Sequence, residues 1–158
     1  MLLKMIGIAL MVLCAYAIGQ LLSSEVERSL SCAGSLCDLL RYTREMIDSF
    51  SMSGPLILAS CDEALLARCG YSGRERPTSF CELMQGCEIG DGECARIFGD
   101  FCRGFGKGYR EEQLRSCERC LDMLSARTEQ LIGEVSAKKK IIVSSALSGA
   151  LMLAILLA

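Results

Sequence analysis

Apolar residues follow two different patterns along this chain. Two runs, residues 5–22 ("MIGIALMVLCAYAIGQLL") and 141–158 ("IIVSSALSGALMLAILLA"), carry no charged residue over 18 positions each. Between them, apolar residues recur at steps of three and four, which is typical of helices that bury one face. No stretch alternates apolar and polar residues one by one, as a half-buried strand does. The pattern therefore predicts an all-α chain, with a helical bundle between two uniformly apolar helices.

Each apolar run is long enough to cross a membrane, because 18 helical residues extend about 27 Å. We therefore expect an N-terminal transmembrane helix over residues 1–22, a helical domain over 23–140 and a C-terminal transmembrane helix over 141–158. A buried core helix is the alternative for either run. The first run also has an alternative as a secretory signal, since "AYA" at 15–17 resembles a cleavage site.

The distribution of basic residues predicts on which side of the membrane the central domain lies. Sixteen of the seventeen lysine and arginine residues fall between the two runs, and Lys138, Lys139 and Lys140 directly precede the second run. Because basic residues beside a span stay in the cytoplasm, we expect a cell-membrane protein whose soluble part is cytoplasmic. The cysteines would then be thiols, since the cytosol is reducing.

Local signals divide the central domain into helices. A first helix over 24–50 is expected to bury one stripe of residues (Val26, Leu30, Ala33, Cys37, Leu40 and Ile47), widened by Leu36, Leu39, Met46 and Phe50. "SGP" at 53–55 ends it, and Pro55 suits the first turn of a second helix that runs to Gly70. Beyond the polar loop 71–77, Ser79 and Glu82 have capping-box spacing, and Asp91 can cap another helix.

The last predicted helix has the most regular pattern. After the glycines of "GKG" at 106–108, residues recur at alternating steps of three and four: Leu114, Cys117, Leu121, Leu124, Thr128, Leu131 and Val135. This is a sustained heptad stripe. Glu111 precedes Arg115 by four residues, the favourable order for an exposed ion pair. No proline interrupts the segment, so we expect the helix to continue through the lysines into the second apolar run.

The stretch "GYREEQLRSCERC" at 108–120 contains a Cys-x-x-Cys pair in a chain with eleven cysteines and no histidine. Cys117 and Cys120 could make a membrane-anchored thiol or metal-binding protein, but a four-thiolate zinc site needs a second close pair. Both cysteines fall inside a predicted helix rather than at its N-terminus, where a helix dipole activates a thiol. Packing as small apolar residues is the favoured interpretation.

Composition narrows the classes of function. The absence of histidine excludes Ser-His and Cys-His nucleophile pairs, and "GFGKG" at 104–108 lacks the spacing of a phosphate-binding loop. A formal net charge of −2 gives no basic surface for nucleic acid. We expect no enzymatic activity, no cofactor, no metal, no small-molecule substrate and no nucleic-acid partner.

Three segments in order resemble one known family. "LLKMIGIALMVLCAYAIG", "LLRYTREMIDSFSMSGPL" and "FGDFCRGFGKGYREEQLRSCERCLDML", followed by the lysine-led apolar tail, resemble the stage III sporulation protein AB family of endospore-forming bacteria. The most specific part is Phe105-Gly106 followed by residues 108–113. The chain departs from the family in residues 60–90, in Phe105 where a leucine is expected, and in its many cysteines.

The resemblance implies a cytoplasmic domain similar to the inner-membrane platform (F) component of type II secretion and type IV pilus machines. Such proteins couple a cytoplasmic motor ATPase to the membrane parts of an export apparatus. Here the setting would be the sporulation channel in the outer forespore membrane of the mother cell, with the stage III sporulation protein AA as the ATPase. The implied partner-contact residues are Lys107, Tyr109, Arg110, Glu111, Glu112 and Gln113. The alternative is that they only form a turn and a charged helix start.

Overall fold

A computed structural model describes the backbone of residues 2–157, and side chains for residues 24, 25, 27–137, 140, 141 and 144. Contacts divide the chain into two compact units, one of residues 28–130 and one of residues 1–27 and 131–158. Among residues whose side chains are described, no helix combines the length and apolar content that crossing a membrane requires. The spans expected over 5–22 and 141–158 lie outside that part, except at positions 141 and 144.

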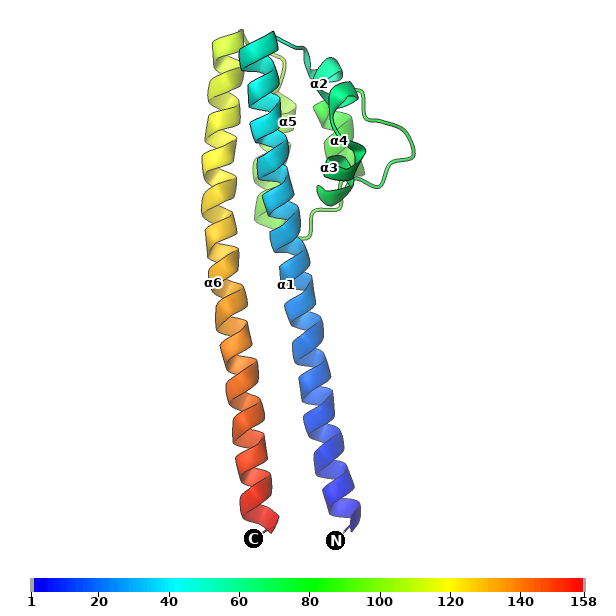
Figure 1. Ribbon diagram of the computed structural model, residues 1–158, viewed down its shortest axis with the longest axis vertical. Helices are drawn as coiled ribbons and strands as arrows, with labels where there is room; N and C mark the ends of the chain where they lie inside the picture. Colours follow the sequence, from blue (N-terminus) through cyan, green and yellow to red (C-terminus); the bar gives the residue numbers. More distant parts are fainter. Residues whose placement is uncertain (1, 158) are drawn as a thin grey trace. The chain divides into compact units, whose positions relative to one another are not determined.

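Six helices make up the described backbone, and the expected all-α class is confirmed for it. Two are long: α1 (Leu2–Phe50) and α6 (Arg110–Leu157). Both run without a break beyond the unit of residues 28–130, as expected for the last helix. Within that unit they run antiparallel and side by side (Figure 1), and the guanidinium of Arg44 on α1 donates to the carboxylate of Glu118 on α6. In this unit both helices bury residues of the predicted stripes: Ala33, Leu36, Cys37, Leu39, Leu40, Ile47, Cys117 and Leu124.

Two short helices replace the single one expected after α1. The break at Gly54 is confirmed, since α2 spans Gly54–Ser60 with Pro55 in its first turn. The prediction of one helix up to Gly70 was wrong, because α3 (Glu63–Arg68) starts anew at Asp62. The Asp62 carboxylate accepts a hydrogen bond from Ala64 N at 3.0 Å, so this side chain caps a new helix. Gly70 follows the end of α3 with φ +90°, which favours glycine.

The next helices begin at the caps that the sequence predicted. α4 (Phe80–Gly86) starts at Ser79, whose hydroxyl accepts from Glu82 N, and α5 (Gly92–Gly104) starts at Asp91, whose carboxylate accepts from Cys94 N. The Glu82 carboxylate accepts from the backbone and hydroxyl of Thr78, both at 2.7 Å. A single antiparallel bridge between Tyr71 and Cys87 joins the loop before α4 to the residue after it.

The core of residues 28–130 combines aliphatic residues, thiols and one aromatic cluster. Of the ten described cysteines, eight are buried, so most occupy core positions as small apolar residues. Phe80, Phe98, Phe101 and Phe105 form the aromatic cluster where α4 meets α5. The prediction that Phe50 widens the buried stripe of α1 was wrong, because this side chain is 67% exposed at the end of the helix.

One largely buried ion pair fastens α6 to the start of α5. The Arg127 guanidinium donates to both carboxylate oxygens of Asp91, at 3.1 and 2.8 Å, and only 17% and 13% of the two side chains are exposed. These hydrogen bonds lower the pKa of Asp91 to about 2. A bidentate pair of this kind fixes orientation as well as distance.

Candidate functional site

The candidate site is the turn that leads from α5 into α6, residues 105–113. Its first residue, Phe105, belongs to the aromatic cluster. The ring of Phe105 lies 4.3 Å from that of Phe80 and 5.2 Å from that of Phe101, measured between centroids. A side chain at Gly54 would meet the Phe105 ring at 3.0 Å, so the start of α2 also packs closely against it. Phe105 therefore anchors the first residue of the turn on two neighbouring helices.

Two glycines give the turn its shape. Gly106 has φ +81°, in the left-handed region that side-chain-bearing residues avoid. At Gly108 a Cβ would lie 2.2 Å from the Glu112 carboxylate, so a larger residue would displace that side chain. The interpretation of "GKG" as a turn is confirmed, and its glycines are required by conformation at 106 and by space at 108.

Hydrogen bonds close the start of α6 on itself. The Glu112 carboxylate accepts from Tyr109 N at 3.2 Å, and the Gln113 amide donates to Gly108 O at 2.9 Å. The first bond satisfies one of the amide groups that lack a partner at a helix N-terminus. Glu112 and Gln113 thus hold the turn, and their polar groups are engaged inside it.

Arg110 joins the turn to the end of α1. Its guanidinium donates to Ile47 O at 3.2 Å and to the Asp48 carboxylate at 2.7 Å, and it also contacts Asp48 O. Ile47 O also accepts from Ser51 N at 3.1 Å, and the cation adds a favourable charge at the C-terminal end of the helix. The arginine therefore caps α1 and fixes the C-terminal end of one long helix to the N-terminal end of the other.

The remaining candidates project into solvent. Tyr109 is 86% exposed, the largest exposed fraction among the large apolar and aromatic side chains that the structure describes, and Lys107 and Glu111 are exposed beside it. An open surface hollow of about 570 Å³ is lined by Tyr109, Arg110, Glu111, Glu112 and Arg115. The structure thus brings the predicted residues together, but it divides them into a supporting set (Arg110, Glu112 and Gln113) and an exposed set (Lys107, Tyr109 and Glu111).

Two exposed apolar residues near this turn were not predicted as part of the site. Phe50, two residues after the Asp48 that binds Arg110, is 67% exposed, and Leu56 on α2 is 57% exposed. Helical periodicity assigned Phe50 to the buried stripe, because periodicity cannot tell where neighbouring helices stop covering a face. The end of α1 and the start of α2 therefore add apolar surface at this end of the unit.

The cysteine pair of the same helix lies in the core. Cys117 is fully buried, Cys120 is 5% exposed, and the Cys120 thiol donates to Ile97 O on α5 at 3.9 Å. Burial is the main cause that raises the pKa of each thiol to about 12. Within the described residues, no group of three or more metal-ligating side chains has an arrangement that could hold an ion. Cys120 lies beside the heptad stripe of α6 and is buried as well, because α5 covers it.

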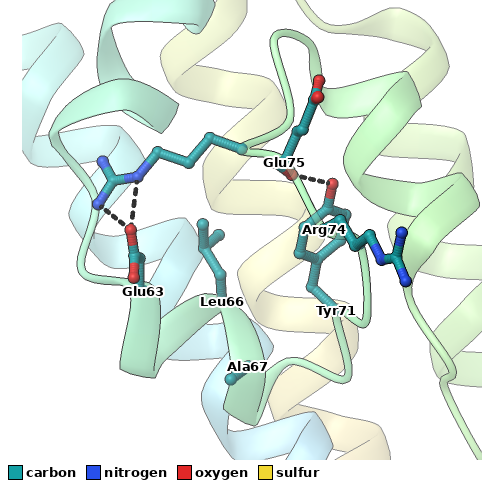
Figure 2. A pocket seen from close by; sticks show the side chains of 8 residues that line it. Glu63, Leu66, Ala67, Tyr71, Arg74 and Glu75 are labelled. Atoms are coloured by element: carbon teal, nitrogen blue, oxygen red, sulfur yellow. Dashed lines mark hydrogen bonds and ion pairs between the residues drawn. The ribbon is translucent and has the colours of Figure 1, made fainter.

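A second surface feature is the small pocket between α3 and the loop 71–76, of about 190 Å³. Figure 2 shows Glu63 on one side and Tyr71 on the other, with Arg74 and Glu75 pointing away. The Arg76 guanidinium donates to the Glu63 carboxylate at 3.1 and 3.0 Å, and Tyr71 Oη donates to Glu75 O at 2.7 Å. Gly73 and Gly86 lie against the Tyr71 ring with no room for a Cβ. These polar groups hydrogen-bond one another, so we interpret the pocket as part of a folded loop and not as a ligand site.

No protein-family model, curated protein or solved structure matches this chain.

Proposed function

We propose that this protein is a non-enzymatic membrane platform component of a sporulation channel. In this proposal its helical domain lies in the cytoplasm and couples a motor ATPase, of the stage III sporulation protein AA type, to the membrane complex. The resemblance to the stage III sporulation protein AB family is most specific in Phe105-Gly106 and residues 108–113. That segment forms the turn at residues 105–113, on which the side chain of Tyr109 is exposed.

The single observation that carries the proposal is the 86% exposure of Tyr109 on a turn that is fixed from three directions. Phe105 anchors the turn in the aromatic cluster, Arg110 ties it to α1, and Glu112 closes the first turn of α6. A rigid aromatic side chain costs little conformational entropy when it is bound, and tyrosine is enriched among residues that dominate protein interfaces. The turn suits a role in contacting another protein.

The two long helices support a role that transmits force or position. α1 and α6 each extend from the unit of residues 28–130 into a terminal apolar segment, and the expected transmembrane spans lie in these segments. In the proposal, Arg110 and Asp48 join the ends of both helices directly beneath the partner surface. A partner bound at the turn would thereby act on both helices at once.

The alternative, a membrane-anchored thiol or metal-binding protein using Cys117 and Cys120, has no favourable observation. Both thiols are buried, and the raised pKa of about 12 leaves them protonated at neutral pH. The thiolate is the form that attacks disulfides and binds metals. We therefore assign the pair to packing.

Co-purification with the ATPase tests the proposal. The full chain is isolated from cells that also express the stage III sporulation protein AA of the same bacterium, as the unchanged chain and with Tyr109→Ala. We expect the unchanged chain to retain the ATPase. The amount of ATPase that co-purifies with Tyr109→Ala should be lower by about tenfold or more, the loss expected from a residue that dominates an interface. The matched control is Met123→Ala, which removes another exposed side chain, 45% accessible, from the same helix. Equal retention by all three chains would overturn the proposed contact.

Charge reversal distinguishes surface contact from structural support. Glu111→Arg changes an exposed side chain whose ion pair with Arg115 is long, at 3.8 Å. Arg110→Glu removes the cap of α1 and places a carboxylate against carbonyl groups, so it is expected to loosen the fold as well as any contact. Glu111→Arg is therefore the cleaner variant, and its unfolding midpoint should fall only slightly, since it replaces an acidic residue in the first turn of α6 by a cation four residues from Arg115.

A further inference from the structure

One thiol differs from the other described cysteines in its exposure. Cys81 on α4 is exposed, Cys87 is half-buried, and the remaining eight are buried. Disulfide exchange starts at a thiol that a small reagent can reach. Among the described cysteines, Cys81 is the position at which such a reagent meets the protein first.

A second cysteine lies directly beneath it on the neighbouring helix. The Cys81 thiol donates to the backbone carbonyl of Cys102 on α5, with 3.4 Å between sulfur and oxygen. That oxygen is two bonds from the Cα of Cys102, whose side chain is 2% exposed. Each cysteine follows a residue of the aromatic cluster, and the rings of Phe80 and Phe101 are 5.7 Å apart, edge to face. The backbones of α4 and α5 therefore approach closely at this pair.

We propose that Cys81 and Cys102 form a redox pair, which a low-molecular-weight disulfide such as oxidised glutathione converts into an intramolecular disulfide that fastens α4 to α5. This device goes beyond the proposed platform function and does not depend on it. It uses an exposed sulfur to receive the oxidant and a buried neighbour to resolve the product.

The reaction proceeds in two exchange steps. The Cys81 thiolate attacks one sulfur of oxidised glutathione, breaks its disulfide bond and releases one glutathione thiolate, which takes up the proton that Cys81 gave up. The Cys102 sulfur then attacks the Cys81 sulfur, loses its proton and releases the second glutathione. The protein loses two electrons and two protons, and one oxidised glutathione becomes two reduced molecules. Burial raises the pKa of the Cys102 thiol, so the second step is the slow one.

Cys81 and Cys120 both lie near Cys102, and exposure to solvent distinguishes Cys81 from the buried Cys120. Cys117 and Cys120 lie on α6, where they are buried, so a small disulfide does not reach them. Cys120 engages Ile97 O through its thiol. The new bond would replace the hydrogen bond between Cys81 and the Cys102 carbonyl, and it would hold Phe80 against Phe101. Because Phe105 packs on both rings, oxidation would also stiffen the support of the turn at 105–113.

Peptide mapping after oxidation tests the pair. The reduced full chain is incubated with oxidised glutathione, quenched with an alkylating reagent and digested without reductant. We expect a cross-linked peptide containing Cys81 and Cys102, and an intact mass that is lower by two hydrogen atoms when it is measured before alkylation. Cys81→Ser should abolish the cross-link, and Cys87→Ser, the matched control at the half-buried thiol, should leave it unchanged. The oxidised chain should also show a higher unfolding temperature than the reduced one.

Three results would overturn the redox pair. The first is a stable glutathione adduct at Cys81 without a cross-link, which would show that Cys102 does not reach it. The second is a cross-link between other cysteines, and the third is no reaction at Cys81. Since Cys81→Ser changes an exposed side chain, its folding is expected to be normal, and the outcome does not depend on whether a variant of buried Cys102 folds.

Discussion

Two short stretches, residues 109–113 at the start of α6 and residues 117–120 inside it, stand one turn apart and have opposite environments. The second carries the chemically conspicuous cysteines, yet Cys117 and Cys120 are covered by α1 and α5. The first consists of ordinary polar residues and a tyrosine, yet it contains the most exposed aromatic side chain among the described residues, Tyr109. The difference teaches that position on the helix, rather than residue type, decides which of them can meet a partner or a ligand.

The largest expected effect comes from placing the same charge in both stretches. Cys117→Asp puts a carboxylate in a fully buried position, and we expect a loss of roughly 3 kcal/mol or more in the free energy of unfolding. Tyr109→Asp should change it by less than about 0.5 kcal/mol, because the side chain is in water. Urea unfolding measures both, and similar losses would mean that the two environments are not different.

Removal of the support beneath the turn should have the next largest effect. Phe105→Ala deletes a half-buried ring that packs on Phe80 and Phe101, and we expect a loss of about 2–3 kcal/mol. Amide hydrogens at 106–109 should exchange faster. Phe105→Leu is the control, since it keeps apolar volume and should cost less than about 1.5 kcal/mol. Unchanged exchange in the alanine variant would mean that the turn does not depend on the aromatic cluster.

The comparison extends to the two arginines that tie α6 to its neighbours. Arg110 is exposed at the turn, whereas Arg127 binds Asp91 in a largely buried pair. Folding lowers the pKa of Asp91 to about 2, below the value near 3.8 of a free side chain. A depressed pKa contributes stability that is fully present above pH 4 and lost as the pH falls towards 2.

Asp91→Asn removes this dependence on pH and keeps a side chain that caps α5. We expect the difference in unfolding free energy between the unchanged chain and the variant to be about 2 kcal/mol at pH 7 and to shrink below pH 4. Denaturant unfolding over pH 2–7 measures it. A difference that stays constant over this range would exclude the ion pair as its source.

The smallest expected effect is that of truncating the cysteine pair without adding charge. Cys117→Ala and Cys120→Ala each remove one sulfur from the core, and we expect a loss of about 1 kcal/mol for each. Urea unfolding of the single and double variants checks this. A gain or loss of bound metal in the double variant, measured by elemental analysis, would contradict a packing role.

Much of the local structure could be predicted from the sequence, because it depends on nearby residues. Ser79 and Asp91 cap the helices that follow them, Pro55 lies in the first turn of α2, and Gly106 turns the chain before α6. The break between α2 and α3 was not predicted. Apolar residues on both sides of Asp62 suggested one helix, and the role of Asp62 as the N-cap of α3 was not recognised.

The candidate site could be located from the sequence but not divided into its roles. A heptad stripe defines one buried face, whereas α6 packs on α1 and α5, so Cys120 is buried beyond that face. Arg110 is charged and looks like a surface residue, yet it caps a helix that ends 60 residues earlier in the chain, from Phe50 to Arg110. Contacts of this kind depend on tertiary structure, and local pattern does not contain them.

Spore formation compares the two stretches directly. It is measured in two strains, and in each the sole copy of this chain carries one set of changes. One strain has Tyr109→Ala, and the other has Cys117→Ala together with Cys120→Ala, with cellular levels of both chains checked against the unchanged one. If the proposed sporulation function holds, the turn is the partner surface and the cysteines only pack, then spores form at the normal level in the cysteine strain and are strongly reduced in the tyrosine strain. Normal sporulation with Tyr109→Ala and failure with the folded cysteine variant would contradict both assignments.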